Sequence, residues 1–180
     1  YFSSPEFRAA LTTFHSFFKY GWASRNPVQF INLYQGMADR QFAMYISGPW
    51  NIGEFSRRMP PELQDDWMTA PMPGPDGNIG VSLAGGSSLV MFTSSKKKDE
   101  VWKLIEYLSK PVVQIAFYQL TGDLPARMEA WKDTSLANNK YAAAFFQQLN
   151  HVKATPKIPE WEQIAQTVRQ ITELLSMDRL

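Results

Sequence analysis

Hydrophobic positions at helical spacing open and close the chain. Ser4, Pro5 and Glu6 have the cap, first-position proline and early acid of a helix start, and Gly21 lies where the pattern stops. The apolar face of this predicted helix consists of Phe7, Leu11, Phe14 and Phe18. A second long helix is predicted after Pro159, with an apolar stripe formed by Trp161, Ile164, Ala165, Val168, Ile171 and Leu175.

Between these ends the pattern alternates short helices with a few strand-like runs. Helices are predicted over residues 28–37, from Pro49, through Val101–Leu108, from Pro111 to Gly122, and over Tyr141–Leu149. Strands are predicted at Phe42–Ser47, at Trp67–Pro71 and over Val81–Phe92, the last broken by Gly85 and Gly86. Prolines and glycines make loops of residues 71–80 and 121–127. The pattern therefore predicts a helix-rich α/β protein with three or four strands.

Composition narrows the class of partner. The chain of 180 residues has a formal net charge of +1, so nothing favours a polyanionic partner such as nucleic acid. Six tryptophans and 14% aromatic residues indicate a neutral ligand with apolar faces, or a well-filled core. There is no cysteine, which excludes disulfides, thiolate metal sites and thiol nucleophiles.

Catalytic and metal-binding patterns are weak. The only histidines, His15 and His151, have no acid at metal-ligand spacing, and Ser87 lies in no nucleophile elbow. The carboxylate pairs 65–66 and 99–100 fall in polar stretches, where their pKa values would not be driven apart as acid–base catalysis requires. We therefore expect no cofactor, no metal and no catalytic residues.

Candidate binding groups lie at the ends of predicted elements. They are Trp50 after Gly48-Pro49, the Gly85-Gly86-Ser87 break, Arg127 after a loop, and Trp161 at a helix start. A sugar ring offers one apolar face and a rim of hydroxyls, so its receptor needs an aromatic plane and fixed donors and acceptors. Tryptophan supplies the plane, glycines expose backbone N–H groups, and arginine brings a planar fork of donors.

Structural roles remain open for each of these groups. Trp50 could fill a core, the two glycines could form only a bulge, Arg127 could cap the C-terminus of a helix, and Trp161 could begin its apolar stripe. The remaining tryptophans are assigned to the core: Trp22, Trp67, Trp102 and Trp131.

A series of motifs spread over nearly the whole chain closely resembles the C-terminal half of family 1 extracellular solute-binding proteins. These are sugar receptors of bacterial ABC importers, related to maltodextrin-binding protein. The motifs, in family order, are FAMYISGPWNIGEF, TAPMPGPDG, LAGGSSLVMF, SKKKDEVWKLIEYLS, TGDLPAR and TPKIPEWEQIAQTV.

The resemblance implies a partial periplasmic-binding-protein type II fold, in which two α/β lobes close on a sugar or oligosaccharide. It implies that Trp50 stacks on the sugar, that Gly85, Gly86 and Ser87 line the cleft, and that Arg127 and Trp161 contribute from a later loop and helix. Asn51 is implied as a further contact. It also implies export to the periplasm or the extracellular space, and delivery of the sugar to ABC permease subunits without catalysis.

Two other classes stay open at this point. A carbohydrate-active enzyme, such as a glycosidase or lyase, would need a pair of cleft carboxylates. A purely structural interaction domain would bury both Trp50 and Trp161.

The resemblance also implies a division of the chain. Residues 1–79 and 126–180 would belong to the C-terminal lobe and residues 80–125 to the other lobe. Because the chain starts at Tyr1 and matches only the later half of the family, we expect a fragment or a processed product. Its apolar faces would then lack their partners, so the fragment is expected to self-associate.

Overall fold

The computed structural model describes residues 2–25 and 32–179, which form two compact units. Unit 1 comprises the described parts of Tyr1–Asn32 and Thr155–Leu180, and unit 2 comprises Leu33–Ala154. Within the described residues, no helix is long and apolar enough to cross a membrane.

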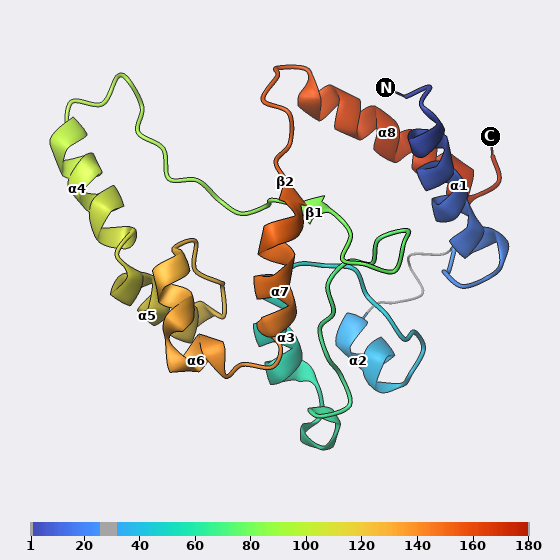
Figure 1. Cartoon of the computed structure of the whole chain (residues 1–180), viewed down its shortest axis with the longest axis horizontal. Coiled ribbons are helices and arrows are strands. Elements are labelled where there is room, and N and C mark those ends of the chain that lie inside the picture. Colours follow the sequence, from blue (N-terminus) through green and yellow to red (C-terminus); the bar gives the residue numbers. More distant parts are fainter. Residues whose placement is uncertain (1, 26–31, 180) are drawn as a thin grey trace. The chain divides into compact units, whose positions relative to one another are not determined.

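Unit 1 is built from two helices that pack together, α1 (Pro5–Lys19) and α8 (Trp161–Ser176), coloured blue and red in Figure 1. The backbone N–H of Phe7 donates to Ser4 Oγ at 3.2 Å, so Ser4 caps α1 as its sequence predicts. The last described turn of the chain returns to α1, where His15 Nε2 lies 2.8 Å from Asp178 Oδ1. Both long predicted helices are confirmed.

Unit 2 contains short helices joined by long connections (Figure 1). The α-helices are α2 (Leu33–Ala38), α3 (Trp50–Arg58), α4 (Lys98–Leu108), α5 (Pro111–Thr121), α6 (Thr134–Ala137) and α7 (Ala143–Gln148). The 3₁₀ helices are η2 (Pro61–Leu63), η3 (Met128–Lys132) and η4 (Leu149–His151). The helices predicted at Pro49, Val101, Pro111 and Tyr141 are therefore confirmed. Of the helix predicted over 28–37, residues 28–31 lie outside the described residues and α2 covers the remainder from Leu33.

The sheet is much smaller than predicted. In the part of the chain that the structure describes, β1 (Ser82–Leu83) pairs in parallel with β2 (Val152–Lys153), and an isolated antiparallel bridge joins Pro73 to Ile79. The strands predicted at residues 42–47 and 67–71 are wrong, and the one predicted over 81–92 shrinks to two residues. A strand forms only where a neighbouring segment completes its backbone hydrogen bonds. The local sequence of a segment does not specify that neighbour.

The core of unit 2 has two aromatic centres. Trp131, Leu136 and Ala142 form a buried cluster, and the Trp131 indole N–H donates to the Pro125 carbonyl at 3.0 Å. Trp67 packs between Phe55 of α3 and Tyr141. Trp131 is thus a core residue, as the sequence predicts, and Trp67 is partly buried against two aromatic rings.

The core assignment of the other two tryptophans is wrong. Trp22 is 70% exposed and Trp102 is 54% exposed. Trp22 follows the C-terminus of α1 and packs there against Phe17 and Tyr20. The sequence around a tryptophan looks the same whether or not another element covers its side chain.

Gln148 joins the loop at 72–80 to the end of α7. Its side-chain Oε1 accepts from the Met72 backbone N–H at 2.8 Å, and its Nε2 donates to the carbonyls of Gly80 and His151 at 2.8 and 2.9 Å. Only 8% of this residue is exposed. This buried amide therefore fixes the chain just before β1 and just before β2.

Candidate functional site

Trp50 is the first residue of α3 and is 59% exposed. Pro49 precedes it with helical dihedrals, and the first turn closes through the N–H of Ile52 onto the Pro49 carbonyl at 3.0 Å. Ile52 and Phe55 bury the opposite side of the same helix. The helix is thus anchored by its apolar side while the indole at its start faces outward.

Asn51 is half-buried beside Trp50. Its Nδ2 donates to Ser47 Oγ, which ties the segment before Gly48 to the first turn of α3. In this structure the amide supports the geometry of the joint between chain and helix.

The loop that carries Arg127 starts against α3. Gly122 ends α5 in the left-handed conformation, with φ +81°, and its N–H donates to the Tyr118 carbonyl at 2.7 Å. A Cβ added to Gly122 would lie 3.5 Å from the Cα of Gly53, one turn along from Trp50. Close approach of these two glycines brings the 121–127 loop and α3 together.

Arg127 itself is exposed and directly precedes η3. Its backbone N–H donates to Gln114 Oε1 of α5 at 2.9 Å, and its Nε lies 3.5 Å from Glu129 Oε2. An exposed ion pair of this length is worth little, so the guanidinium is available to another acceptor. It does not cap the C-terminus of a helix.

The Gly85-Gly86-Ser87 segment follows β1 and lies in the open. Nothing lies within 4 Å of a Cβ added at either glycine, and Gly86 has φ +124°, which favours glycine. The N–H of Ala84 still pairs with the Lys153 carbonyl at 2.8 Å, after which the parallel ladder ends. No strand follows the two glycines, so they lie after the end of β1 and do not break a longer strand; Gly85, Gly86 and Ser87 are exposed.

Trp161 is the first residue of α8 and belongs to unit 1, whereas Trp50, Asn51, Gly85, Gly86, Ser87 and Arg127 belong to unit 2. Its side chain is half-buried at the start of the apolar stripe of α8. Within unit 2 the structure joins the elements that carry Trp50 and Arg127, and it places the glycine segment at the end of β1.

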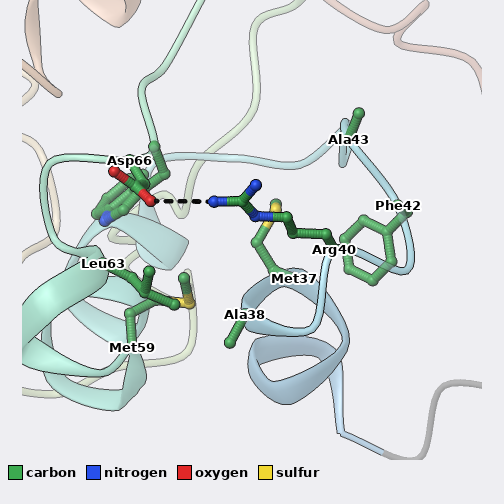
Figure 2. A pocket seen from close by; sticks show the side chains of 9 residues that line it. Met37, Ala38, Arg40, Phe42, Ala43, Met59, Leu63 and Asp66 are labelled. Carbon is green, nitrogen blue, oxygen red and sulfur yellow. Dashed lines mark ion pairs between the residues drawn. The ribbon is translucent and has the colours of Figure 1, made fainter.

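A separate cavity of about 500 Å³ lies between α2 and the segment from α3 to Trp67. Figure 2 shows Arg40 extending toward Asp66, with its Nη2 3.7 Å from Asp66 Oδ2. Arg40 has φ +57° at the end of α2, a position that glycine commonly occupies. The side chains that line the cavity are those of Met37, Ala38, Arg40, Phe42, Ala43, Met59, Leu63, Asp66 and Trp67. No predicted site residue is among them, and no sequence motif predicted this cavity.

Several carboxyl groups in unit 2 have lowered pKa values because hydrogen-bond partners stabilise their ionised form. Hydrogen bonding to Arg57 is the main cause that lowers the pKa of Glu54, and hydrogen bonding to Lys140 lowers the pKa of Asp65. Such groups are poor proton donors near neutral pH. Across residues 2–25 and 32–179, no three His, Cys, Asp or Glu side chains are grouped to hold a metal ion.

Comparison with known proteins identifies the class. The family described as bacterial extracellular solute-binding protein matches residues 4–168, which is most of the chain. The chain belongs to this family.

Among solved structures, the sugar-binding protein MalE from Xanthomonas citri is 48% identical, with a TM-score of 0.91 over 97% of this chain and 44% of its own. A solute-binding protein of an ABC transporter from Thermotoga lettingae, bound with α-D-tagatose, is 30% identical, with a TM-score of 0.78 over 99% of this chain and 46% of its own. These similarities confirm a partial type II periplasmic-binding fold.

Relatives identified by sequence are also binding proteins. The maltodextrin-binding protein MdxE of Bacillus subtilis is 28% identical over 68% of this chain and 28% of its own length. A binding protein of Brucella abortus is 37% identical over 51% of this chain and 21% of its own. The chain thus spans less than a third of these relatives and less than half of the solved structures.

Proposed function

We propose that this chain is the C-terminal half of an exported receptor that captures a sugar or oligosaccharide between two lobes and delivers it to an ABC permease. The proposal rests on family membership and on the names of the relatives, which include a sugar-binding protein, a maltodextrin-binding protein and a tagatose-bound protein. Binding and release need no catalytic group in the receptor.

The single observation that carries the proposal in this chain is the exposed indole of Trp50. Large aromatic side chains are usually covered, yet 59% of Trp50 is exposed at the start of a helix whose other side is buried. An indole held this way offers an apolar plane to the C–H face of a sugar ring. The interaction-domain alternative would bury both Trp50 and Trp161, whereas Trp50 is exposed and Trp161 is half-buried.

Arg127, the Gly85-Gly86-Ser87 segment and Asn51 complete the proposed site in unit 2, and Trp161 at the start of α8 is proposed separately as a sugar contact. The guanidinium of Arg127 would donate to sugar hydroxyls from a loop that begins against α3, and the glycine segment would present backbone N–H groups. We further propose that residues 80–125 belong to the lobe whose front half comes from a longer chain, and that residues 1–79 and 126–180 belong to the other lobe.

Replacing the indole tests the proposal. In the full-length protein that contains this sequence, Trp50→Ala should weaken binding of maltose, maltotriose or D-tagatose by roughly 1–3 kcal/mol, while the melting temperature changes little. Titration calorimetry and thermal unfolding measure the two effects. Trp102→Ala is a matched control, because Trp102 is also exposed but lies on α4 outside the proposed site.

A Trp50→Ala protein with full sugar affinity and a much lower melting temperature would show that this indole stabilises the fold and binds no sugar. Loss of affinity in both tryptophan variants would point to a general effect on the protein.

A further inference from the structure

Residue 48 is a glycine for which the backbone gives no reason. The left-handed glycines of the described chain are Gly21, Gly77, Gly86 and Gly122, and Gly48 is not among them. It precedes Pro49, a position that favours extended backbone, which any residue adopts. Something other than its own dihedral angles must require the missing side chain.

The obstacle to a side chain at residue 48 is Trp50. A Cβ added to Gly48 would lie 2.6 Å from Cε3 of Trp50 and closer still to Cζ3 and Cη2, and these are its nearest neighbours. Real Cβ atoms essentially never approach heavy atoms within 3.0 Å. The side-chain position of residue 48 is therefore occupied by the six-membered ring of the indole.

The three distances also give the orientation of the ring. Cε3, Cζ3 and Cη2 are consecutive ring carbons, and a point beyond the ring edge would be near two of them and far from the third. A point close to all three lies over the face of the ring. One face of the indole thus covers the Cα of Gly48.

We propose that Gly48 is the positioning residue of the sugar platform: its bare Cα supports one face of the Trp50 ring and leaves the other face open to the ligand. This inference rests on the proposed function of Trp50 and adds what holds the ring. Pro49 and the first turn of α3 fix the backbone between the two residues. The indole therefore has a set orientation before any sugar arrives, which lowers the entropy lost on binding.

The proposal predicts an unusual pair of effects for Gly48→Ala. The nearest obstacles are side-chain atoms at an exposed position, so the ring moves aside and the fold is kept. Alanine also narrows the unfolded ensemble, so the melting temperature should stay equal or rise slightly. The displaced ring no longer presents the same plane, and sugar affinity should fall by about tenfold.

Ser56→Ala is the matched control. It changes an exposed side chain of the same helix, further along α3 and away from the Gly48–Trp50 contact. Calorimetry on the full-length protein with maltose, maltotriose and D-tagatose should find Ser56→Ala equal to the unsubstituted protein. If Gly48→Ala also binds equally while Trp50→Ala does not, Gly48 has no positioning role and the proposed function stands. If Trp50→Ala binds equally, the platform itself is wrong.

A second readout needs no sugar. Because an aromatic face covers the Cα of Gly48, its Hα resonance in a glycine-labelled NMR spectrum should be shifted upfield by the ring current. The shift should disappear in Trp50→Leu and remain in Trp102→Leu. A Gly48 Hα resonance that is the same in Trp50→Leu and in the unsubstituted protein would overturn the proposal, whatever the affinities are.

Discussion

The indole of Trp67 stacks on the phenol ring of Tyr141, with ring centroids 3.9 Å apart and planes inclined by 6°. Phe55 of α3 lies on Trp67 as well, at 5.2 Å and 35°. The Tyr141 hydroxyl donates to the Gln64 carbonyl, and the Tyr141 carbonyl accepts from Thr69 Oγ1 at 2.7 Å. This stack connects α3, which carries Trp50, to the segment that precedes α7.

The stack predicts a measurable coupling between its two rings. Trp67→Leu and Tyr141→Leu should each destabilise the protein, and the double variant should lose less than the sum by about 0.5–1.5 kcal/mol. Chemical unfolding of all four proteins of the cycle measures this difference. Pairing Tyr141→Leu with Trp102→Leu, on exposed α4, should give additive losses. Additivity in the Trp67 cycle would show that the rings contribute only through separate burial.

Replacing the buried Gln148 should lower the free energy of unfolding much more than the same replacement of an exposed glutamine. Gln148→Leu leaves the Met72 N–H and the Gly80 and His151 carbonyls without this partner, so unfolding free energy should fall by about 1–3 kcal/mol. Gln147→Leu, at the exposed neighbouring position on α7, should change stability by only about 0.5 kcal/mol. Equal effects of the two substitutions in denaturant unfolding would contradict the role of Gln148.

Arg127 predicts sensitivity to a conservative change. Arg127→Lys keeps the positive charge but loses the planar fork of donors, so sugar affinity of the full-length protein should drop by about 1 kcal/mol, roughly fivefold. Arg58→Lys, at the exposed end of α3 beside Glu54, is the control and should bind normally. Unchanged binding by Arg127→Lys in calorimetry would remove this residue from the site.

Asp178 predicts a pH-dependent contribution to the α1–α8 pair. Hydrogen bonds from His15 and then Arg25 lower the pKa of Asp178 below its ordinary value of 3.8. A carboxyl group whose pKa is lower in the folded state stabilises that state at pH values above its unfolded-state pKa. This contribution is lost as the pH falls through the folded-state pKa. Asp178→Asn should therefore lower the melting temperature at neutral pH and make little difference near pH 2.

The measurement is thermal unfolding of both proteins at several pH values. A difference between Asp178→Asn and the unsubstituted protein that is the same at neutral pH and near pH 2 would show that the carboxylate charge is not the cause.

The exposed apolar segments predict self-association of the 180-residue chain. Val81, Leu83, Val90 and Phe92 are between 59% and 74% exposed, and Leu104 and Val112 on α4 and α5 are also exposed. Together they leave more apolar surface uncovered than a monomer usually tolerates. We expect light scattering to report a dimer or a higher oligomer, and calorimetry to find weak sugar binding or none. A stable monomer with micromolar affinity would contradict both this expectation and the placement of residues 80–125.

Local sequence signals predicted the helices well. Ser4, Pro111 and Gly122 act through bonds and dihedral angles within a few residues, so their effect is visible in the sequence alone. The order of motifs identified the family, and the position of Trp50 after Gly48-Pro49 marked it as a candidate binding residue. The predicted division into residues 1–79, 80–125 and 126–180 stays a prediction.

The formation of strands and the burial of side chains depended on contacts between segments far apart in the sequence. Residues 42–47 form an apolar run typical of a strand but form no strand among the described residues, and β1 pairs with β2 about seventy positions further along the chain. The partial burial of Trp67 and the exposure of Trp102 both depend on what lies beside each ring in space. A single sequence carries no direct record of those contacts.

The sequence by itself determined most of the α-helices of this protein and which family it belongs to, because capping, proline and glycine effects act locally and motifs keep their order. The short helix α6 and the 3₁₀ helices η2 and η3 were not predicted. Only the tertiary structure decided that Gln148 binds the distant loop at 72–80, that Gly122 meets Gly53, and that the ring of Trp50 lies over Gly48. Each of these depends on side-chain direction and close approach, which spacing along the chain does not specify.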